Sequence, residues 1–356
     1  MWRLPHPGKA AGGGGARDGA DDRAEIYALF LNLDRTDGPW AVHAQGRWRD
    51  TKLRPFYASN VWLQEGWVAY TAGSRDADAD RRGRVERPRN PTLTLRAGKI
   101  YQRLGRFWDG SFFGNVHYFD GLKLDPEFGA EAVATLPAGS VGGALEAYVQ
   151  GLLDSDRVNG ALSGRDLETV FDARERGLAA GVRAHLPVAF PGGAPLVAAL
   201  RISGLASRAE LPDTLRELSP AGSGSAFPRA EGEHRTLEHV SADAEVRWRS
   251  LLAYGEWTRR ATGLRGPAAA TIPGSRATYW LAGVHASFGP LSFRYDFSQG
   301  EHDDAGFRDT IHQPGVTARL ARGVSALLEY DDWRRHRPSG SDLVDRSLNA
   351  VLLLEF

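Results

Sequence analysis

The sequence predicts an all-β chain: a transmembrane, antiparallel, up-and-down β-barrel of about sixteen strands. Three observations support this prediction. Apolar and polar residues alternate along most of the chain, short and long connections follow one another in turn, and no run reaches the roughly 18 apolar residues that a membrane helix needs. The mean hydropathy of −0.37 argues against a helical membrane protein. It does not argue against a barrel, because alternating strands average out in such a sum.

The alternation is strict in residues 241–249, where SADAEVRWR places small or apolar side chains on one face and mainly charged ones on the other. Successive side chains of a strand point to opposite faces, so this segment forms a strand with one apolar and one charged face. Residues 291–298 and 347–356 follow the same pattern, although Val351 and Leu353 blur the last one. The side chains expected to face lipid are Ala242, Ala244, Val246, Trp248, Phe293, Tyr295, Phe297, Leu348, Ala350, Leu352 and Phe356.

About fifteen strands are expected, one fewer than the even number that is usual in single-chain bacterial barrels. They begin near Ala24, Trp40, Asn60, Thr92, Tyr118, Val141, Glu175, Pro195, Leu237, Leu251, Arg276, Leu291, Arg308, Val324 and Leu343. Tight turns, near residues 250, 289–290 and 321–323, alternate along the chain with long polar connections such as 154–172 and 208–236. Tight turns at one end and long loops at the other are typical of a membrane barrel. The long charged connection 73–91 is the exception.

Residues 1–22 are expected to form a flexible segment ahead of a barrel at 23–356. The segment contains the run Gly12 to Gly15 and has no apolar core of the kind a signal peptide requires. Together with the odd strand count, this leads us to expect that a first strand or a signal peptide precedes the sequence given.

The end of the chain resembles the C-terminal signal of Gram-negative outer-membrane β-barrel proteins. The residues that carry the resemblance are Leu348, Ala350, Leu352, Leu354 and Phe356. It implies location in the bacterial outer membrane, contact with outer-membrane lipid, and recognition of the final strand by the barrel-assembly machinery. Residues 96–124 also resemble porin-like barrels, without fixing a subfamily.

Composition narrows the function classes. Lys and Arg number 44, and so do Asp and Glu, so the net charge of zero argues against a nucleic-acid binder. With 0 Cys, disulfides and thiolate metal sites are excluded. We find no phosphate-binding loop, dinucleotide fingerprint or GxSxG elbow, so we predict no cofactor and no enzyme. The cluster Glu233, His234, Glu238 and His239 fits no metal signature and is interpreted as part of a solvated loop.

The polar strand faces should point inward and line a water-filled pore, because about sixteen strands leave an aqueous channel. The alternative is a lumen plugged by salt bridges. The predicted pore-lining residues are Arg47, Arg49, Glu146, Arg183, Arg201, Asp243, Glu245, Arg247, Arg249, Glu256, Arg294, Asp296 and Arg319. Because inward Arg and carboxylate residues are nearly balanced, ion selectivity should be weak.

The connection at 103–121 is unlike a solvated loop, because it is rich in aromatic residues. We predict that it folds into the lumen as a constriction loop; a cap packed on the barrel rim is the alternative. The residues expected to face the solute path are Arg103, Arg106, Trp108, Asp109, Asn115 and Asp120.

The function predicted from these features is an outer-membrane porin, a channel for passive diffusion of ions and small hydrophilic solutes. Two alternatives stay open. One is an outer-membrane barrel for specific uptake or export, or with a hydrolase site at its rim. The other is a secreted, soluble β protein that binds carbohydrate. The sequence leaves a monomer and a homotrimer equally open.

Overall fold

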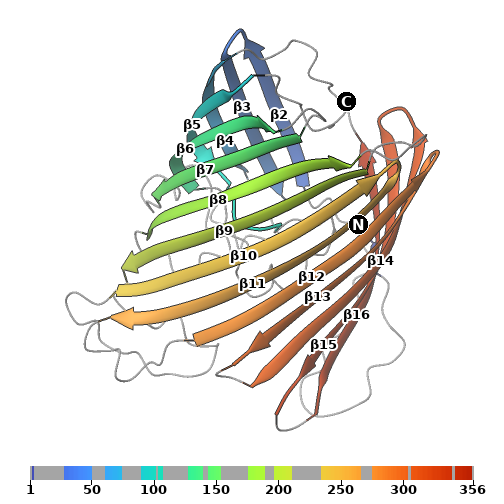
Figure 1. Cartoon of the computed structure of the whole chain (residues 1–356). Helices are drawn as coiled ribbons and strands as arrows, with labels where there is room; N and C mark the ends of the chain where they lie inside the picture. The colour runs from blue at the N-terminus through green and yellow to red at the C-terminus, as the bar shows by residue number, and fades with distance from the viewer. Residues whose placement is uncertain are drawn as a thin grey trace.

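The computed structural model describes the strands and the connections next to them. The described residues are 2–3, 28–49, 61–73, 90–101, 103–106, 127–138, 143–153, 175–188, 196–210, 234–265, 275–303, 306–338 and 341–354. All of the strands belong to one antiparallel sheet in the order β1-β16-β15 and so on, down to β2. Apart from β1, each strand therefore pairs with its neighbours in sequence, as an up-and-down barrel requires. Figure 1 shows this sheet curling from β2, in blue, to β14–β16, in red.

The strand bounds are β1 Trp2–Arg3, β2 Ala28–Asp37, β3 Trp40–Arg49, β4 Val61–Ala72, β5 Thr92–Ile100, β6 Glu127–Ala138, β7 Gly143–Leu153, β8 Glu175–Val188, β9 Leu196–Glu210, β10 His234–Trp248, β11 Leu251–Arg265, β12 Ser275–Phe288, β13 Leu291–His302, β14 Phe307–Ala321, β15 Val324–His336 and β16 Leu343–Leu354.

The fold predicted from sequence is confirmed, and most of the fifteen long strands, β2–β16, begin within two residues of the expected positions. Three begin elsewhere. β2 begins at Ala28, and β10 begins at His234 rather than Leu237. β6 begins at Glu127 rather than Tyr118. Pro126 directly precedes β6 in the sequence, and a proline has no N–H to give to a strand ladder.

The two ends of the sheet differ as the sequence predicted. At one end, here called the turn end, residues 38–39, 249–250, 289–290 and 322–323 close two-residue hairpins. Gly289 has a φ of +58°, the left-handed conformation that such turns demand and that glycine adopts without strain. The opposite end, here called the loop end, carries the longer connections, such as those between β5 and β6 and between β9 and β10.

Polarity is inverted relative to a soluble domain. Large apolar side chains on the outer face are exposed, including Ile202 at 66% and Leu352 at 60%. The inner face carries buried polar groups, including Gln150, Asp296 and Glu329, each at 0%. A membrane barrel shows this arrangement because lipid contacts the outside and the polar face lines the interior. It argues against the soluble alternative.

The predicted lipid-facing residues follow this inversion. Ala242, Ala244, Val246, Trp248 and Phe293 are exposed, as are Tyr295, Ala350 and Leu352. Phe297 and Leu348 are partly buried on the same face, and Phe356 lies outside the described residues. Arg247 and Arg294 lie on the opposite, inner face, as the alternation requires.

The sheet ends at β2 on one side and at β1 on the other. β1 extends the sheet beyond β16, where Trp2 pairs with Ala350 and Arg3 with Asn349. The rest of the predicted flexible segment 1–22 lies outside the described residues, so its flexibility stays a prediction. Within the described part of the chain, no helix is long and apolar enough to cross a membrane.

Candidate functional site

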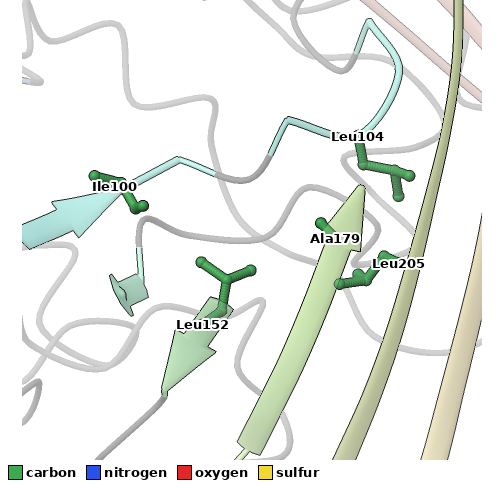
Figure 2. Packing of buried hydrophobic residues seen from close by; sticks show 5 residues of the cluster. All are labelled: Ile100, Leu104, Leu152, Ala179 and Leu205. Carbon is green, nitrogen blue, oxygen red and sulfur yellow. The ribbon is translucent and has the colours of Figure 1, made fainter. Parts of the chain in front are cut away.

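A short segment leaves β5 at the loop end and lies against the inner wall of the sheet. Its described residues are Tyr101 and 103–106, and we call it the lumenal segment. An apolar cluster anchors it: Leu104 packs with Ile100, Leu152, Ala179 and Leu205, all at most 4% exposed. Figure 2 shows Leu104 beside Ala179 of β8 and Leu205 of β9. This anchoring places the polar groups of the segment against the polar inner faces of the neighbouring strands.

Arg103 connects the segment to β6 and β7. Its Nε lies 2.7 Å from Glu131 Oε2, and its Nη1 lies 2.8 Å from Glu146 Oε1. The backbone N–H of Arg103 donates to Gln150 Oε1 at 3.0 Å, and the Tyr148 hydroxyl donates to the Arg103 carbonyl. A guanidinium with two carboxylate partners on adjacent strands is held firmly, because charge-assisted hydrogen bonds are the stronger ones.

Gly105 makes the sharpest bend of the segment. Its N–H donates to Ser203 Oγ at 3.0 Å, and Arg201 Nη1 donates to its carbonyl at 2.5 Å. Its φ is +55°, a conformation that favours glycine. A Cβ at this position would overlap Glu256 Oε1 and Ser241 Oγ. The segment therefore needs a glycine here both for its backbone conformation and for close contact with β10 and β11.

Arg106 connects the segment to β10 and β11. Its backbone N–H donates to Glu256 Oε2 at 2.5 Å, and its guanidinium forms an ion pair with Glu245. The same guanidinium lies over the ring of Tyr254, 4.0 Å from the ring centroid. Glu256 is only 4% exposed, and its other oxygen accepts hydrogen bonds from Ser241 at 3.0 Å and Thr258 at 2.8 Å. A buried carboxylate needs such donors to offset its desolvation.

The inner faces of β13–β16 carry ion pairs and hydrogen bonds that join one strand to another. Arg294 forms an ion pair with Glu329 on β15, and Arg335 binds Asp309 on β14 through two hydrogen bonds of 2.8 and 2.6 Å. Asp331 accepts hydrogen bonds from Gln313 at 2.9 Å and from Ser347 and Asn349 on β16. Asp309 and Asp331 have partners on adjacent strands, whereas Arg294 reaches Glu329 across β14.

Tyr254 joins the two sides of the wall. Its hydroxyl donates to Asp296 on β13, while its ring lies under the Arg106 guanidinium. His285 Nε2 lies 3.0 Å from the same Asp296 oxygen. Tyr254 thus connects the contacts that the segment makes on β10 and β11 with the polar residues of β12 and β13.

The structure brings many of the predicted pore-lining residues together. Glu146, Arg201, Glu245 and Glu256 all contact the lumenal segment. Three more lie next to this group: Asp243 Oδ2 is 3.3 Å from Arg201, while Arg183 and Arg247 lie 4.0 and 3.3 Å from Glu245. Arg294 and Asp296 lie further along the wall, on β13.

The remaining predicted residues lie elsewhere. Arg249 belongs to the β10–β11 turn, with a φ of 51° and its guanidinium over Trp248, so its predicted place on a strand face is wrong. The tight hairpin ends the β10 alternation at Trp248. Arg319 is exposed near the turn end of β14, and Arg47 and Arg49 belong to β3. Trp108, Asp109, Asn115 and Asp120 lie outside the described residues.

Sequence reasoning missed several residues of the inner wall, some of which hold the segment. Glu131 could have been predicted as an inner-wall residue, because it is the charged residue in the otherwise apolar stretch AEAVA of β6. Tyr148 and Gln150 stand on the polar face of β7, where their spacing from Glu146 places them in one row. Asp309 and Arg335 share the ladder between β14 and β15, which only the register reveals.

Three members of the His- and Glu-containing cluster lie on a strand. His234, Glu238 and His239 belong to β10 rather than to a solvated loop, which corrects the sequence interpretation. His239 is buried on the inner face and Glu238 is exposed on the outer one, so successive side chains point away from each other. Within the described ranges, no group of three or more His, Asp or Glu residues is placed to hold a metal ion.

Known proteins match this chain in structure. No family model matches it, and no curated protein matches it in sequence. Outer-membrane expressed OmpT of Vibrio cholerae is similar, with a TM-score of 0.52 and 10% identity over 91% of this chain and 88% of that one.

Two further structures of this Vibrio cholerae outer membrane protein are also similar. A loop L8 deletion mutant has a TM-score of 0.51 and 12% identity, covering 91% of this chain and 89% of that one. The in-vitro folded trimer form has a TM-score of 0.50 and 10% identity, covering 92% and 89%. At such identities the likeness shows the fold alone, and that fold is the bacterial outer-membrane β-barrel.

Proposed function

We propose that this chain is a porin of the outer membrane, which lets ions and small hydrophilic solutes diffuse passively and catalyses no reaction. The observation that carries the proposal is the lumenal segment, whose Arg103 and Arg106 are bound to carboxylates of the inner wall. A segment held inside a barrel narrows the path through it, and the charged groups around it act on what passes.

The arrangement of the wall supports a channel rather than a catalytic site. The described groups around Arg103 and Arg106 are paired carboxylates, amides and hydroxyls, an arrangement suited to holding the segment in place. The strand number supports a channel as well, because barrels of about sixteen strands leave an aqueous lumen. Charged side chains on the inner face then meet water and ions rather than a closed core.

The proposal includes three expectations about assembly and form. The constriction extends along residues 107–121 to Trp108, Asp109, Asn115 and Asp120. The final strand is recognised by the assembly machinery, with Phe356 as its last residue. The similarity to a protein crystallised in a trimer form fits a homotrimer.

Single-channel recording tests the function. The refolded chain should give stepwise, voltage-independent ion conductance in a planar bilayer. Deleting Phe107 to Asn115 should raise the single-channel conductance if the loop narrows the lumen. A folded wild-type protein that conducts no ions would contradict the porin proposal. Unchanged conductance from a folded deletion variant would contradict the constriction and favour a cap on the rim.

A further inference from the structure

Exposed arginines mark the outer face of the sheet towards the loop end. They are Arg176 on β8, Arg259 on β11, Arg276 on β12, Arg308 on β14, Arg334 on β15 and Arg346 on β16. We call them the arginine rim. Their neighbours in sequence show which way they point. Thr258, Ala277, Asp309 and Ser347 are all buried on the inner face. Alternation therefore directs the adjacent arginines outward, where the exposed apolar side chains also lie.

The rim carries a positive excess. Among the outward strand positions whose side chains are described, three carboxylates lie in the same region: Glu238, Glu301 and Asp332. Six arginines accompany them on the strands, an excess of three positive charges. Just beyond the strand ends, Arg337, Asp303 and Asp342 are also exposed, and counting them reduces the excess to two. At the turn end, the outward positions of β10–β14 are apolar, as Trp248, Leu251, Phe288, Leu291 and Leu320 show. On β10–β14 the outward charges thus lie towards the loop end, whereas Arg35 on β2 and Arg322 in the β14–β15 turn are exposed close to the turn end.

Two members of the rim are held in place by an acid between them. Arg334 Nη2 lies 2.7 Å from Asp332 Oδ2, and Arg346 Nε lies 3.3 Å from Asp332 Oδ1. The two arginine side chains remain 44% and 43% exposed. Asp332 therefore orients two guanidinium groups on adjacent strands while leaving much of each accessible from outside. The N–H groups of these guanidiniums that do not face Asp332 can donate to the oxygens of a phosphate group.

We propose that the arginine rim binds the phosphate groups of anionic lipids in the leaflet on the loop side. The exposed apolar band, which includes Leu178, Trp280 and Leu328, would contact the acyl chains of the same lipids. The long arginine side chains can extend from that band to the level of the headgroups. Basic residues near an anionic leaflet are attracted to it, and this attraction weakens with salt. The inference rests on the membrane fold and does not depend on whether the lumen conducts.

The test compares the lipid preference of two variants, one that lacks arginines of the rim and one that lacks exposed arginines close to the turn end. The rim variant is Arg259→Gln, Arg276→Gln and Arg308→Gln. The control variant is Arg35→Gln and Arg322→Gln, which removes exposed arginines close to the turn end. Each refolded protein is placed in phosphatidylcholine vesicles with a rising fraction of phosphatidic acid. Quenching of tryptophan fluorescence by brominated phosphatidylcholine then gives the relative affinity for the anionic lipid, at low and at high salt.

The wild-type protein and the control variant should prefer phosphatidic acid at low salt, and the preference should shrink at high salt. The rim variant should lose about fivefold in relative affinity for each arginine removed. Heat-modifiable migration on a gel checks that every barrel has folded, and Arg276→Gln alone supplies the comparison where the triple variant does not refold. Equal preference in the wild-type and rim proteins would overturn the proposal. An equal loss per arginine removed in the rim variant, which lacks three arginines, and in the control variant, which lacks two, would also overturn it, because net charge alone would then explain binding.

Discussion

The inner wall has two regions that satisfy their buried charges differently. On β6–β11, Glu131, Glu146, Glu245 and Glu256 receive cations or N–H groups from the lumenal segment, which is not part of the sheet. On β13–β16, the carboxylates of Asp309, Glu329 and Asp331 are paired strand to strand. We call these the segment-bound region and the self-paired region.

The difference shows how a barrel can fix a loop inside itself. In the self-paired region, the described carboxylates are paired from strand to strand. In the segment-bound region, Arg103 and Arg106 add to cations of the wall itself, such as Arg96 beside Glu131 and Arg247 beside Glu245, and a buried charge with too few partners is costly. The wall therefore selects the position of the segment, and the two are expected to respond differently to substitution.

The largest expected effect is in the self-paired region. Arg335→Ala removes both hydrogen bonds to Asp309, which is 1% exposed. Leaving a buried carboxylate without its partner should cost about 3–5 kcal/mol in the free energy of unfolding. Denaturant unfolding in lipid vesicles, followed by tryptophan fluorescence, measures this. Single-channel conductance should stay close to wild type, because Arg335 lies on β15 and its described partners, Asp309, Phe307 and Trp333, belong to β14 and β15 rather than to the lumenal segment.

A matched double variant sharpens that prediction. In the double variant Asp309→Ala and Arg335→Ala, the buried carboxylate is removed as well as its partner. This variant should recover much of the stability lost in Arg335→Ala. A double variant as unstable as Arg335→Ala would show that packing of the arginine between Phe307 and Trp333, rather than the ion pair, stabilises this region.

A smaller effect on stability but a larger one on conduction is expected in the segment-bound region. Gly105→Val places a side chain where Glu256 and Ser241 already lie, in a backbone conformation that valine avoids. Overpacking of this kind should cost about 1–3 kcal/mol. The segment should leave the wall, and conductance should rise. Planar-bilayer recording measures the change.

Gly151→Val is the matched control, because Gly151 is exposed and a Cβ added there meets nothing within 4 Å. Its conductance should equal that of the wild type. A Gly105→Val barrel that folds and conducts like the control would show that the segment does not limit the passage of ions.

The sequence predicted the barrel far better than it predicted the site. Alternation placed Arg294 and Glu256 on the inner face, because a two-residue period fixes the face of every strand residue once one is known. It did not show that Glu256 accepts the N–H of Arg106, since those residues are 150 positions apart and meet only through the register of β10 and β11. The boundary of β10 was missed because His234 and Glu238 look like loop residues, although pairing with β9 and β11 continues to His234.

The smallest expected effect is on ion selectivity, and it again separates the two regions. In the wild-type barrel, Arg and carboxylate side chains are interspersed along the wall, so their fields should largely cancel beyond a Debye length of about 10 Å at 0.1 M salt. We expect a weak preference for anions, measured as the reversal potential in a salt gradient. Arg106→Gln removes a cation beside Glu245 and Glu256, and should shift selectivity towards cations. Arg35→Gln, at an outward position on β2, should leave selectivity unchanged.

A strong selectivity of either sign in the wild type would mean that a local group of charges, rather than the balance of the whole wall, controls passage. If Arg106→Gln then abolished that selectivity, the controlling group would be the lumenal segment with its carboxylates, and the self-paired region would contribute only to the stability of the barrel.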